Sequence, residues 1–315
     1  MTGVQTCALP ISGDLFLAWK GTSSDAHDFV SAAAERGAVA AVVERPVDAA
    51  LPQLVVDNGR RAAALAADAV YGTPSAEMQT VGVTGTNGKT TTALMIRHLL
   101  AAEMETAVIG TLGLVDSHGV RAGTEGLTTP GPVQVAVWLR ELADGGTGAV
   151  ILEASSHALS QHRLDGVSFD VGVFTNLSQD HLDYHGTVEE YGAAKARLVD
   201  LVAPGGTLVV NAEDAAWRSL PSGGRTVTTY GMSPGADLVA SELTLTPSGS
   251  AFTLTVDGSE HAVRLPLVGR YNVENALAAI AAARALGLPI ETIARRLASV
   301  PQVPGRLEVV IQDRK

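Results

Sequence analysis

A glycine-rich run beside a lysine and two threonines is the feature of this sequence with the clearest chemistry. The run reads Gly82-Val83-Thr84-Gly85-Thr86-Asn87-Gly88-Lys89-Thr90-Thr91. Glycines allow a tight turn with inward-pointing N–H groups, and the N-terminus of a following helix attracts anions. Lys89 can neutralise the outer phosphates of a nucleotide, and the Thr90 hydroxyl can bind Mg²⁺. These residues predict a phosphate-binding loop that takes ATP.

The segments around this loop have the order that such a site requires. A strand pattern at residues 80–84 precedes the loop, and a helical pattern at residues 89–102 follows it. The glycines stand at positions 82, 85 and 88, whereas the common pattern G-x-x-x-x-G-K-[ST] would place its first glycine at Val83. A chance glycine-rich turn before a lysine is the competing interpretation, and the strand–loop–helix context disfavours it.

Composition bounds the remaining possibilities. The chain has 315 residues, of which 46% are hydrophobic and 17% charged, so it can bury a core in each of two domains. Its net charge is −11 and no basic patch stands out, which argues against a nucleic-acid partner. No apolar run approaches the ~18–20 residues that span a bilayer. The single cysteine, Cys7, permits no intrachain disulfide, and we expect a cytoplasmic protein.

The hydrophobic pattern divides the chain at a run of turn-forming residues, 71–75. Residues 13–77 predict a small α/β domain. Residues 78–311 begin with strands that alternate with helices, which is typical of a mostly parallel sheet covered on both faces. Beyond residue 211, short turns join the strand patterns and predict a small antiparallel sheet, so the fold class is α/β. The predicted strands are 15–18, 38–43, 54–56, 80–84, 107–109, 149–152, 171–175, 207–210, 236–245, 251–256 and 261–267; the predicted helices are 29–35, 60–70, 89–102, 133–142, 188–201, 272–286 and 290–297.

The two ends of the sequence differ from the rest. Residues 1–12 resemble the translation of a sequencing-library adapter, and we leave them out of the fold prediction. At the other end, Leu307 to Ile311 has a strand-like pattern. Both ends suggest a piece of a longer protein.

Several further runs occur in the order found in the Mur ligases, the enzymes that add amino acids to a UDP-linked peptidoglycan precursor. The irregular glycine spacing of the loop also resembles their form of it. Gly13-Asp14-Leu15-Phe16 and His27-Asp28-Phe29 are similar to the UDP-sugar domain of the branch that acts on UDP-MurNAc-L-Ala-D-Glu. The resemblance covers residues 13 to about 311, and the other runs are Thr128-Thr129-Pro130, Glu153-Ala154-Ser155-Ser156-His157-Ala158-Leu159, Gln161-His162-Arg163, Thr175-Asn176-Leu177-Ser178-Gln179-Asp180-His181-Leu182-Asp183-Tyr184-His185-Gly186, Tyr191-Gly192-Ala193-Ala194-Lys195-Ala196-Arg197-Leu198 and Gly269-Arg270-Tyr271-Asn272-Val273-Glu274-Asn275.

The resemblance implies an ATP-dependent amide ligase. In that reaction ATP phosphorylates a carboxylate, an amine attacks the acyl phosphate, and phosphate leaves. The partners would be UDP-MurNAc-L-Ala-D-Glu and an amino acid, with meso-diaminopimelate and L-lysine both left open, and a monomer is expected. The family also has a C-terminal domain that holds the amino acid. Because it would lie beyond Lys315, we expect these 315 residues to bind substrate without completing ligation.

The resemblance also implies roles for individual residues. Lys89, His181 and Lys195 would be catalytic, and Lys195 would be carbamylated by CO₂. The expected nucleotide contacts are Gly85, Thr86, Asn87, Gly88, Lys89, Thr90, Thr91, Asn272, Asn275 and Arg306. The expected Mg²⁺ ligands are Thr90, Glu153, His181 and carbamylated Lys195, and the expected UDP-substrate contacts are Thr128, Thr129, Ser155, Gln161 and Arg163.

Each of these residues also has an ordinary structural interpretation. Glu153 at a strand end would commonly form a salt bridge, and Lys195 would commonly be a solvated lysine. Two other functions remain open: a related ligase of the folylpolyglutamate or cyanophycin type, and a P-loop ATPase or switch protein. Neither related ligase explains the Gly13 to Phe29 match, and the switch protein gives no role to Lys195.

Overall fold

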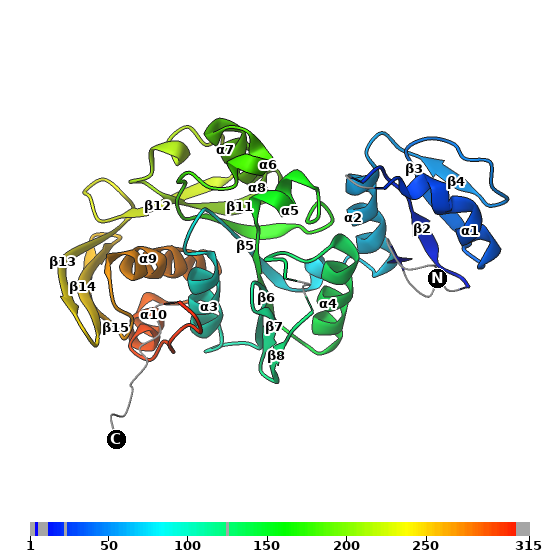
Figure 1. Cartoon of the computed structure of the whole chain (residues 1–315). Helices are drawn as coiled ribbons and strands as arrows, with labels where there is room; N and C mark the ends of the chain where they lie inside the picture. The colour runs from blue at the N-terminus through cyan, green and yellow to red at the C-terminus, as the bar shows by residue number, and fades with distance from the viewer. Residues whose placement is uncertain (1–3, 6–11, 22–23, 124–125, 307–315) are drawn as a thin grey trace, which may run out of the picture. The chain divides into compact units, whose positions relative to one another are not determined.

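The computed structural model describes residues 4–5, 12–21, 24–123 and 126–306, and the chain forms two compact units. The units do not simply follow the chain order. The first contains Met1–Glu77, Pro130–Gly145 and His157–Val167, and the second contains the remaining segments. Figure 1 shows the elements of both units.

The first unit is built on a parallel four-stranded sheet with the order β1-β2-β3-β4. Its apolar side chains alternate between the two faces, as the period of a strand requires. Phe16 belongs to one hydrophobic cluster with Val30, whereas the adjacent Leu17 belongs to another with Ala63. The elements are β1 (Val4–Gln5), β2 (Leu15–Leu17), α1 (Val30–Glu35), β3 (Ala40–Val43), β4 (Gln53–Val55), α2 (Gly59–Val70), α4 (Pro132–Asp144) and most of α5 (Ser156–Ser160).

A segment distant in sequence is fixed to α2 within this unit. The ring of His162 contacts Asp165 through Nδ1 at 2.8 Å and the Asn58 amide through Nε2 at 3.1 Å. Gly166 lies so close to the carbonyl of Ala64 that a Cβ at this position would be 2.6 Å from the oxygen. These contacts place residues 157–167, and with them the predicted substrate contacts in that run, beside the N-terminal half of α2.

The second unit contains one eleven-stranded sheet with the order β15-β14-β13-β12-β11-β10-β5-β9-β6-β7-β8. Its centre, from β12 to β6, is parallel, and both ends turn antiparallel. The predicted antiparallel strands therefore continue the parallel sheet, through the β12–β13 pair. The strands are β5 (Gln79–Thr84), β6 (Thr106–Gly110), β7 (Gly113–Asp116), β8 (Gly119–Arg121), β9 (Ala149–Glu153), β10 (Phe169–Phe174), β11 (Val202–Asn211), β12 (Thr226–Gly231), β13 (Leu238–Thr246), β14 (Gly249–Val256) and β15 (Ser259–Leu265).

Helices pack against this sheet. In Figure 1, α9 (Arg270–Ala285) and α10 (Ile290–Leu297) lie between α3 (Lys89–Leu100) and the curved strands β13 to β15. The interior of α9 is alanine-rich and buried almost all round, so it can approach both neighbours closely. The other helices are α6 (Leu182–His185), α7 (Val188–Ala196) and α8 (Leu198–Leu201).

The structure differs from the sequence prediction in several elements. The helix predicted over residues 188–201 is interrupted at Arg197, and Leu198 then packs where Gly82 and Gly172 leave room on the sheet. Strands β7, β8 and β12 were not predicted because β7 and β8 are short and β12 is rich in threonine. The strand-like run at residues 307–311 lies outside the described residues.

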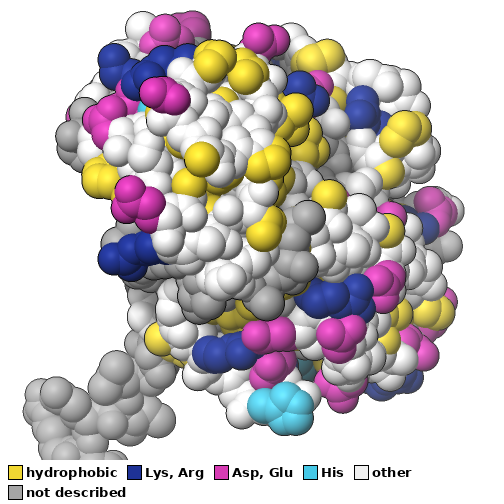
Figure 2. Space-filling view, turned by 90° about the vertical axis from the view of Figure 1, so that its right-hand side faces the viewer, with side chains coloured by type: hydrophobic (Ala, Val, Ile, Leu, Met, Phe, Trp, Pro, Cys, Tyr) yellow, Lys and Arg dark blue, Asp and Glu magenta, His cyan; other side chains and the backbone are white. Residues whose placement is uncertain are grey.

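The surface of the first unit carries isolated apolar side chains, among them Phe29, Val39, Leu54 and Val55. On the face drawn in Figure 2, hydrophobic side chains are interspersed with charged ones of both signs. Within the described residues, no helix has both the length and the apolar character needed to cross a membrane.

Candidate functional site

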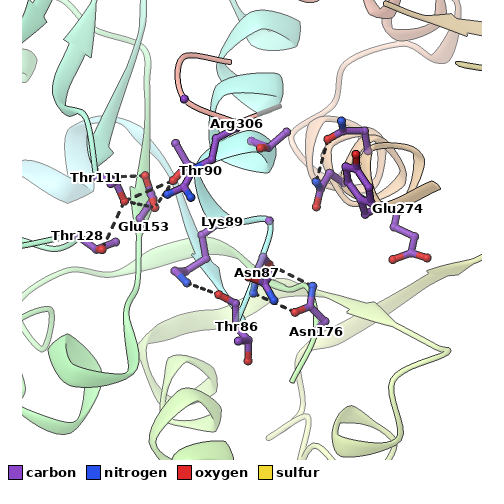
Figure 3. A pocket seen from close by; sticks show the side chains of 16 residues that line it. Thr86, Asn87, Lys89, Thr90, Thr111, Thr128, Glu153, Asn176, Glu274 and Arg306 are labelled. Carbon is purple, nitrogen blue, oxygen red and sulfur yellow. Dashed lines mark hydrogen bonds between the residues drawn. The ribbon is translucent and has the colours of Figure 1, made fainter. Parts of the chain in front are cut away.

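The glycine-rich run forms a loop between β5 and α3 in the second unit, as its sequence predicts (Figure 3). Gly85 and Gly88 have positive φ angles of 143° and 86°. A Cβ on Gly85 would be 1.8 Å from Thr175 Oγ1, and one on Gly88 would be 2.2 Å from Asn275 Oδ1. Glycine is therefore required at both positions by backbone conformation and by space. With glycines at positions 85 and 88, α3 begins at Lys89, and the first N–H groups of this helix can face an anion.

The side chain of Lys89 folds back over this loop. Its Nζ donates to the carbonyl oxygens of Gly85 and Thr86, both at 2.9 Å. Burial lowers the pKa of Lys89, and the nearby Glu153 carboxylate opposes that shift. The ammonium group is thus held beside the loop by acceptors that an incoming phosphate can replace.

A buried carboxylate lies at the floor of the same cleft. Glu153 ends β9 and is only 1% exposed. Its Oε2 accepts from the hydroxyls of Thr90 at 2.9 Å and Thr111 at 3.0 Å, and its Oε1 accepts from the Thr111 N–H at 2.9 Å. Burial raises the pKa of Glu153, although the three hydrogen bonds favour its charged form. Gly110 gives it space, because a Cβ there would be 2.1 Å from Oε1.

Replacing Glu153 with glutamine tests whether this carboxylate binds a cation. The Glu153→Gln side chain keeps the shape and an acceptor for the Thr111 N–H, so we expect the fold to persist. It loses the negative charge that a hard cation requires, and Mg²⁺-dependent ADP binding should weaken about 10- to 100-fold. Calorimetry of ADP with and without Mg²⁺ measures the change.

Glu77→Gln is the matched control, because Glu77 is a carboxylate of the first unit that accepts from Arg140 at 2.6 Å. Equal Mg²⁺ dependence in the Glu153→Gln variant and the parent would exclude Glu153 as a metal ligand.

Lys195 is a buried amine on α7 and is 1% exposed. Its Nζ donates to the Gly85 carbonyl at 2.7 Å, so it shares that acceptor with Lys89, and it lies 4.3 Å from the ring centroid of Tyr191. Burial, assisted by the positive charge of Lys89, lowers the pKa of Lys195 to about 6. The amine is therefore largely neutral at pH 7, which is the form that reacts with CO₂. The solvated-lysine interpretation of Lys195 is wrong.

His181 lies in the loop before α6 and has a positive φ of 51°. Its side chain is 48% exposed, its Nε2 lies 3.5 Å from Asp180 Oδ2, and its ring centroid is 6.2 Å from that of Tyr191. The nearby His185 is buried, and its Nε2 hydrogen-bonds Ser156 Oγ at 3.0 Å. Across the described residues, no group of three or more His, Cys, Asp or Glu side chains is arranged to hold a metal ion. The role of His181 as a metal ligand remains a prediction.

The far end of the cleft is formed by α9 and by the last residues before position 307. Asn272 and Asn275, one turn apart, are joined by a hydrogen bond of 3.3 Å, and Asn275 Oδ1 also accepts from Thr92 at 3.3 Å. Arg306 lines the same cleft, which has a volume of about 660 Å³ (Figure 3). The structure therefore brings the predicted contacts of the loop from Thr86 onward, of α9 and of Arg306 to one cavity of suitable size for a nucleotide, whereas the predicted contact Gly85 does not line it.

The predicted substrate contacts fall into two groups. Thr128 lines the cleft, and Thr129 is buried beside it, with its hydroxyl donating to the Glu153 carbonyl at 2.6 Å and lying 3.0 Å from Ser155 Oγ. These contacts make Thr129 a support for the end of β9. Gln161 and Arg163 belong to the first unit, where the Arg163 side chain donates to Gln161 Oε1 at 2.6 Å.

Sequence reasoning missed five cleft residues: Thr111, Asn176, Tyr271, Glu274 and Gly305. Thr111 follows the end of β6, which pairs in parallel with β9, so it meets Glu153 at one edge of the sheet. That position was available from the strand pattern. Glu274 lies within the predicted helix 272–286 and Tyr271 directly precedes it, and neither carried a distinguishing signal.

A glycine-rich loop at a helix N-terminus, a buried carboxylate beside it and a buried lysine meet at one cleft of an α/β fold. The sequence profile described as the Mur ligase middle domain matches residues 83–283, and the chain belongs to the Mur ligase family. UDP-N-acetylmuramoyl-L-alanyl-D-glutamate–2,6-diaminopimelate ligase of Geobacillus thermodenitrificans is 42% identical over 306 residues, which cover 95% of this chain and 62% of that protein. This chain therefore spans about three fifths of the length of such curated relatives.

Solved structures agree with this assignment. A structure of UDP-N-acetylmuramoyl-L-alanyl-D-glutamate–2,6-diaminopimelate ligase superimposes with a TM-score of 0.85 and 30% identity, over 99% of this chain and 65% of that one. Folylpolyglutamate synthase of Mycobacterium tuberculosis, complexed with ADP, gives a TM-score of 0.65 with 18% identity, over 79% and 63% of the two chains. The second likeness is one of fold.

Proposed function

We propose that this chain provides the nucleotide site and the UDP-sugar site of an ATP-dependent amide ligase that extends UDP-MurNAc-L-Ala-D-Glu with meso-diaminopimelate. The observation that carries the proposal is the convergence of Lys89, Glu153 and Lys195 on one phosphate loop. The named relatives favour diaminopimelate over L-lysine, which the sequence left open. We further propose that the protein works in the cytoplasm as a monomer.

The reaction has two bond-forming steps. A carboxylate oxygen of the D-glutamyl residue attacks the γ-phosphorus of ATP, and the bond to ADP breaks. The amine nitrogen of the incoming amino acid then attacks the acyl carbon, phosphate leaves, and the nitrogen loses a proton. Both steps bring anions together, so charge neutralisation and positioning supply most of the catalysis. Lys89 and the N-terminus of α3 meet the phosphates for this purpose.

The residues present fit a magnesium ion. Glu153 and Thr90 offer a carboxylate and a hydroxyl at the cleft floor, which are the hard oxygen ligands that Mg²⁺ prefers. When bound, Mg²⁺ would neutralise charge on the β- and γ-phosphate oxygens. Carbamylated Lys195 would add a second anionic group beside the loop, and His181 would be a further ligand. Thr90 and Glu153 are the residues with the strongest geometric support.

Ligand binding distinguishes this proposal from its alternatives. Calorimetry with UDP-MurNAc-L-Ala-D-Glu, a folate and ADP-Mg²⁺ should give binding of the UDP compound and of ADP, and none of the folate. Binding of folate instead would favour the folylpolyglutamate synthase type. Binding of ADP alone would favour a P-loop ATPase or switch protein and would overturn the proposed substrate.

A further inference from the structure

Two residues of the phosphate loop, Thr86 and Asn87, are hydrogen-bonded to the segment that follows β10. The Thr86 N–H donates to the Asn176 carbonyl at 2.7 Å, and the Thr86 hydroxyl accepts from the Ser178 N–H at 2.9 Å. Thr175 adds a hydrogen bond of 2.7 Å from its hydroxyl to the Asn87 carbonyl. The loop is therefore held by a neighbouring strand end as well as by its own turn.

Asn176 makes the most specific of these contacts, because its side-chain amide hydrogen-bonds both the N–H and the carbonyl of the same residue, Asn87. Its Oδ1 accepts from the Asn87 N–H at 3.0 Å, and its Nδ2 donates to the Asn87 carbonyl at 3.1 Å (Figure 3). The amide thus imitates a strand partner for Asn87. Its orientation is fixed, since a flipped amide would put donor against donor and acceptor against acceptor.

This pairing decides which loop N–H groups a phosphate can use. The N–H groups of Thr86 and Asn87 both point to Asn176 and are already satisfied. The first N–H groups of α3 have no acceptor within the helix, because an α-helix leaves its first four donors free. The N–H groups that a phosphate can use therefore begin at Gly88 and Lys89, and the preceding two residues border the phosphate site without donating to it.

We propose that Asn176 is a positioning residue: its amide holds Asn87 so that the loop keeps the open, phosphate-ready conformation before a nucleotide arrives. A free loop would have to be ordered at the moment of binding, and only the competent fraction would bind. Asn176 removes that cost without itself contacting the reacting atoms. The inference rests on the proposed nucleotide function of this cleft.

The experiment compares the parent chain with Asn176→Ala, Asn176→Asp and the control Asn211→Ala. Asn211 is a buried asparagine at the end of the adjacent strand β11, and its Oδ1 accepts from the Glu213 N–H at 3.0 Å and not from a loop residue. Two quantities are measured: the dissociation constant of ADP-Mg²⁺ by calorimetry, and amide hydrogen exchange of the nucleotide-free protein by NMR.

In Asn176→Ala, we expect ADP to bind about tenfold more weakly, because the two hydrogen bonds from the Asn176 side chain to the Asn87 backbone are lost. The Asn87 amide should exchange at least about tenfold faster, since its acceptor is gone. The Thr86 amide should be unchanged, because its acceptor is the backbone carbonyl of residue 176 in every variant. Asn176→Asp keeps an acceptor for the Asn87 N–H and should restore that amide's protection. Asn211→Ala should leave both loop amides and the ADP constant as in the parent.

Three outcomes overturn the proposal. Unchanged ADP affinity in Asn176→Ala would show that the loop needs no such support. Equal acceleration of the Thr86 and Asn87 amides, or loss of Asn87 protection in Asn176→Asp as well, would indicate general loosening. Failure of the parent chain itself to bind ADP would instead refute the proposed nucleotide function, so the two failures are distinguishable.

Discussion

A Lys195→Met variant is expected to be more stable than the parent at neutral pH and unable to form a carbamate. Lys195 is 1% exposed and its pKa falls to about 6 from the ordinary value of 10.5. Burying the amine therefore requires it to lose its proton at pH 7, which costs roughly 2–5 kcal/mol of folding free energy. Methionine has a similar length and no charge, so it removes that cost.

The stability difference between the parent and Lys195→Met should depend on pH. Between about pH 6 and pH 10.5 the unfolded lysine binds a proton that the folded one does not, so the parent's free energy of unfolding rises with pH across this window. The methionine variant lacks this contribution, and its advantage should shrink from pH 7 towards pH 9. Urea unfolding at pH 6.5, 7.5 and 9.0, with CO₂ excluded, measures it. Lys195→Arg keeps its charge and should be less stable than the parent at every pH.

The same position should carry the carbamate. At pH 7 about nine tenths of an amine with a pKa near 6 is neutral, and the neutral nitrogen attacks CO₂ to give a carbamate and one proton. ¹³C-labelled bicarbonate should therefore give a carbamate carbon signal in the parent and none in Lys195→Met. A Lys195→Ala variant should regain Mg²⁺-dependent ADP binding with added short-chain carboxylic acids. A parent that shows no carbamate at ample CO₂ would refute this role, and a methionine variant less stable than the parent would refute the burial cost.

The local parts of this site were predictable from sequence because each depends on neighbours along the chain. The loop, the start of α3 at Lys89 and the position of Glu153 at a strand end all follow from glycine spacing and hydrophobic period. The burial of Lys195 was not predictable in this way. Tyr191 and Lys195 lie one helical turn apart, but only the tertiary structure shows that this face of α7 meets the loop.

Contacts between distant segments account for most of what sequence reasoning missed. Asn176 stands 89 positions from Asn87, and nothing in either local run indicates that they pair. The same holds for the first unit, where residues 157–167 join α2 through His162 and Asn58, 104 positions apart. Polar side chains at the carboxyl ends of adjacent parallel strands are the exception, because topology alone brings Thr111 to Glu153.

Replacing Gly85 with alanine is expected to abolish nucleotide binding by the loop. The new Cβ would lie 1.8 Å from Thr175 Oγ1 and 3.0 Å from both the N and the O of Asn176, while the φ of 143° disfavours any side chain. Steric overlap and backbone strain together should cost about 2–5 kcal/mol of folding free energy. ADP affinity should fall at least about 100-fold, because the loop moves away from α3.

Two further variants separate the causes of that loss. Gly235→Ala is the control for backbone strain alone, since Gly235 has a φ of 106° and a Cβ added there would meet no atom within 4 Å; it should cost roughly 1 kcal/mol and leave ADP binding intact. Thr175→Ala removes the hydroxyl that the new methyl group meets. If overlap dominates, Thr175→Ala should restore part of the stability and of the ADP affinity of Gly85→Ala, while Asn176 limits the recovery. Calorimetry measures the ADP affinity of each variant. Full ADP affinity in Gly85→Ala would show that the loop can shift without losing its phosphate contacts. The close packing of Gly85 against Thr175 would then have no part in nucleotide binding.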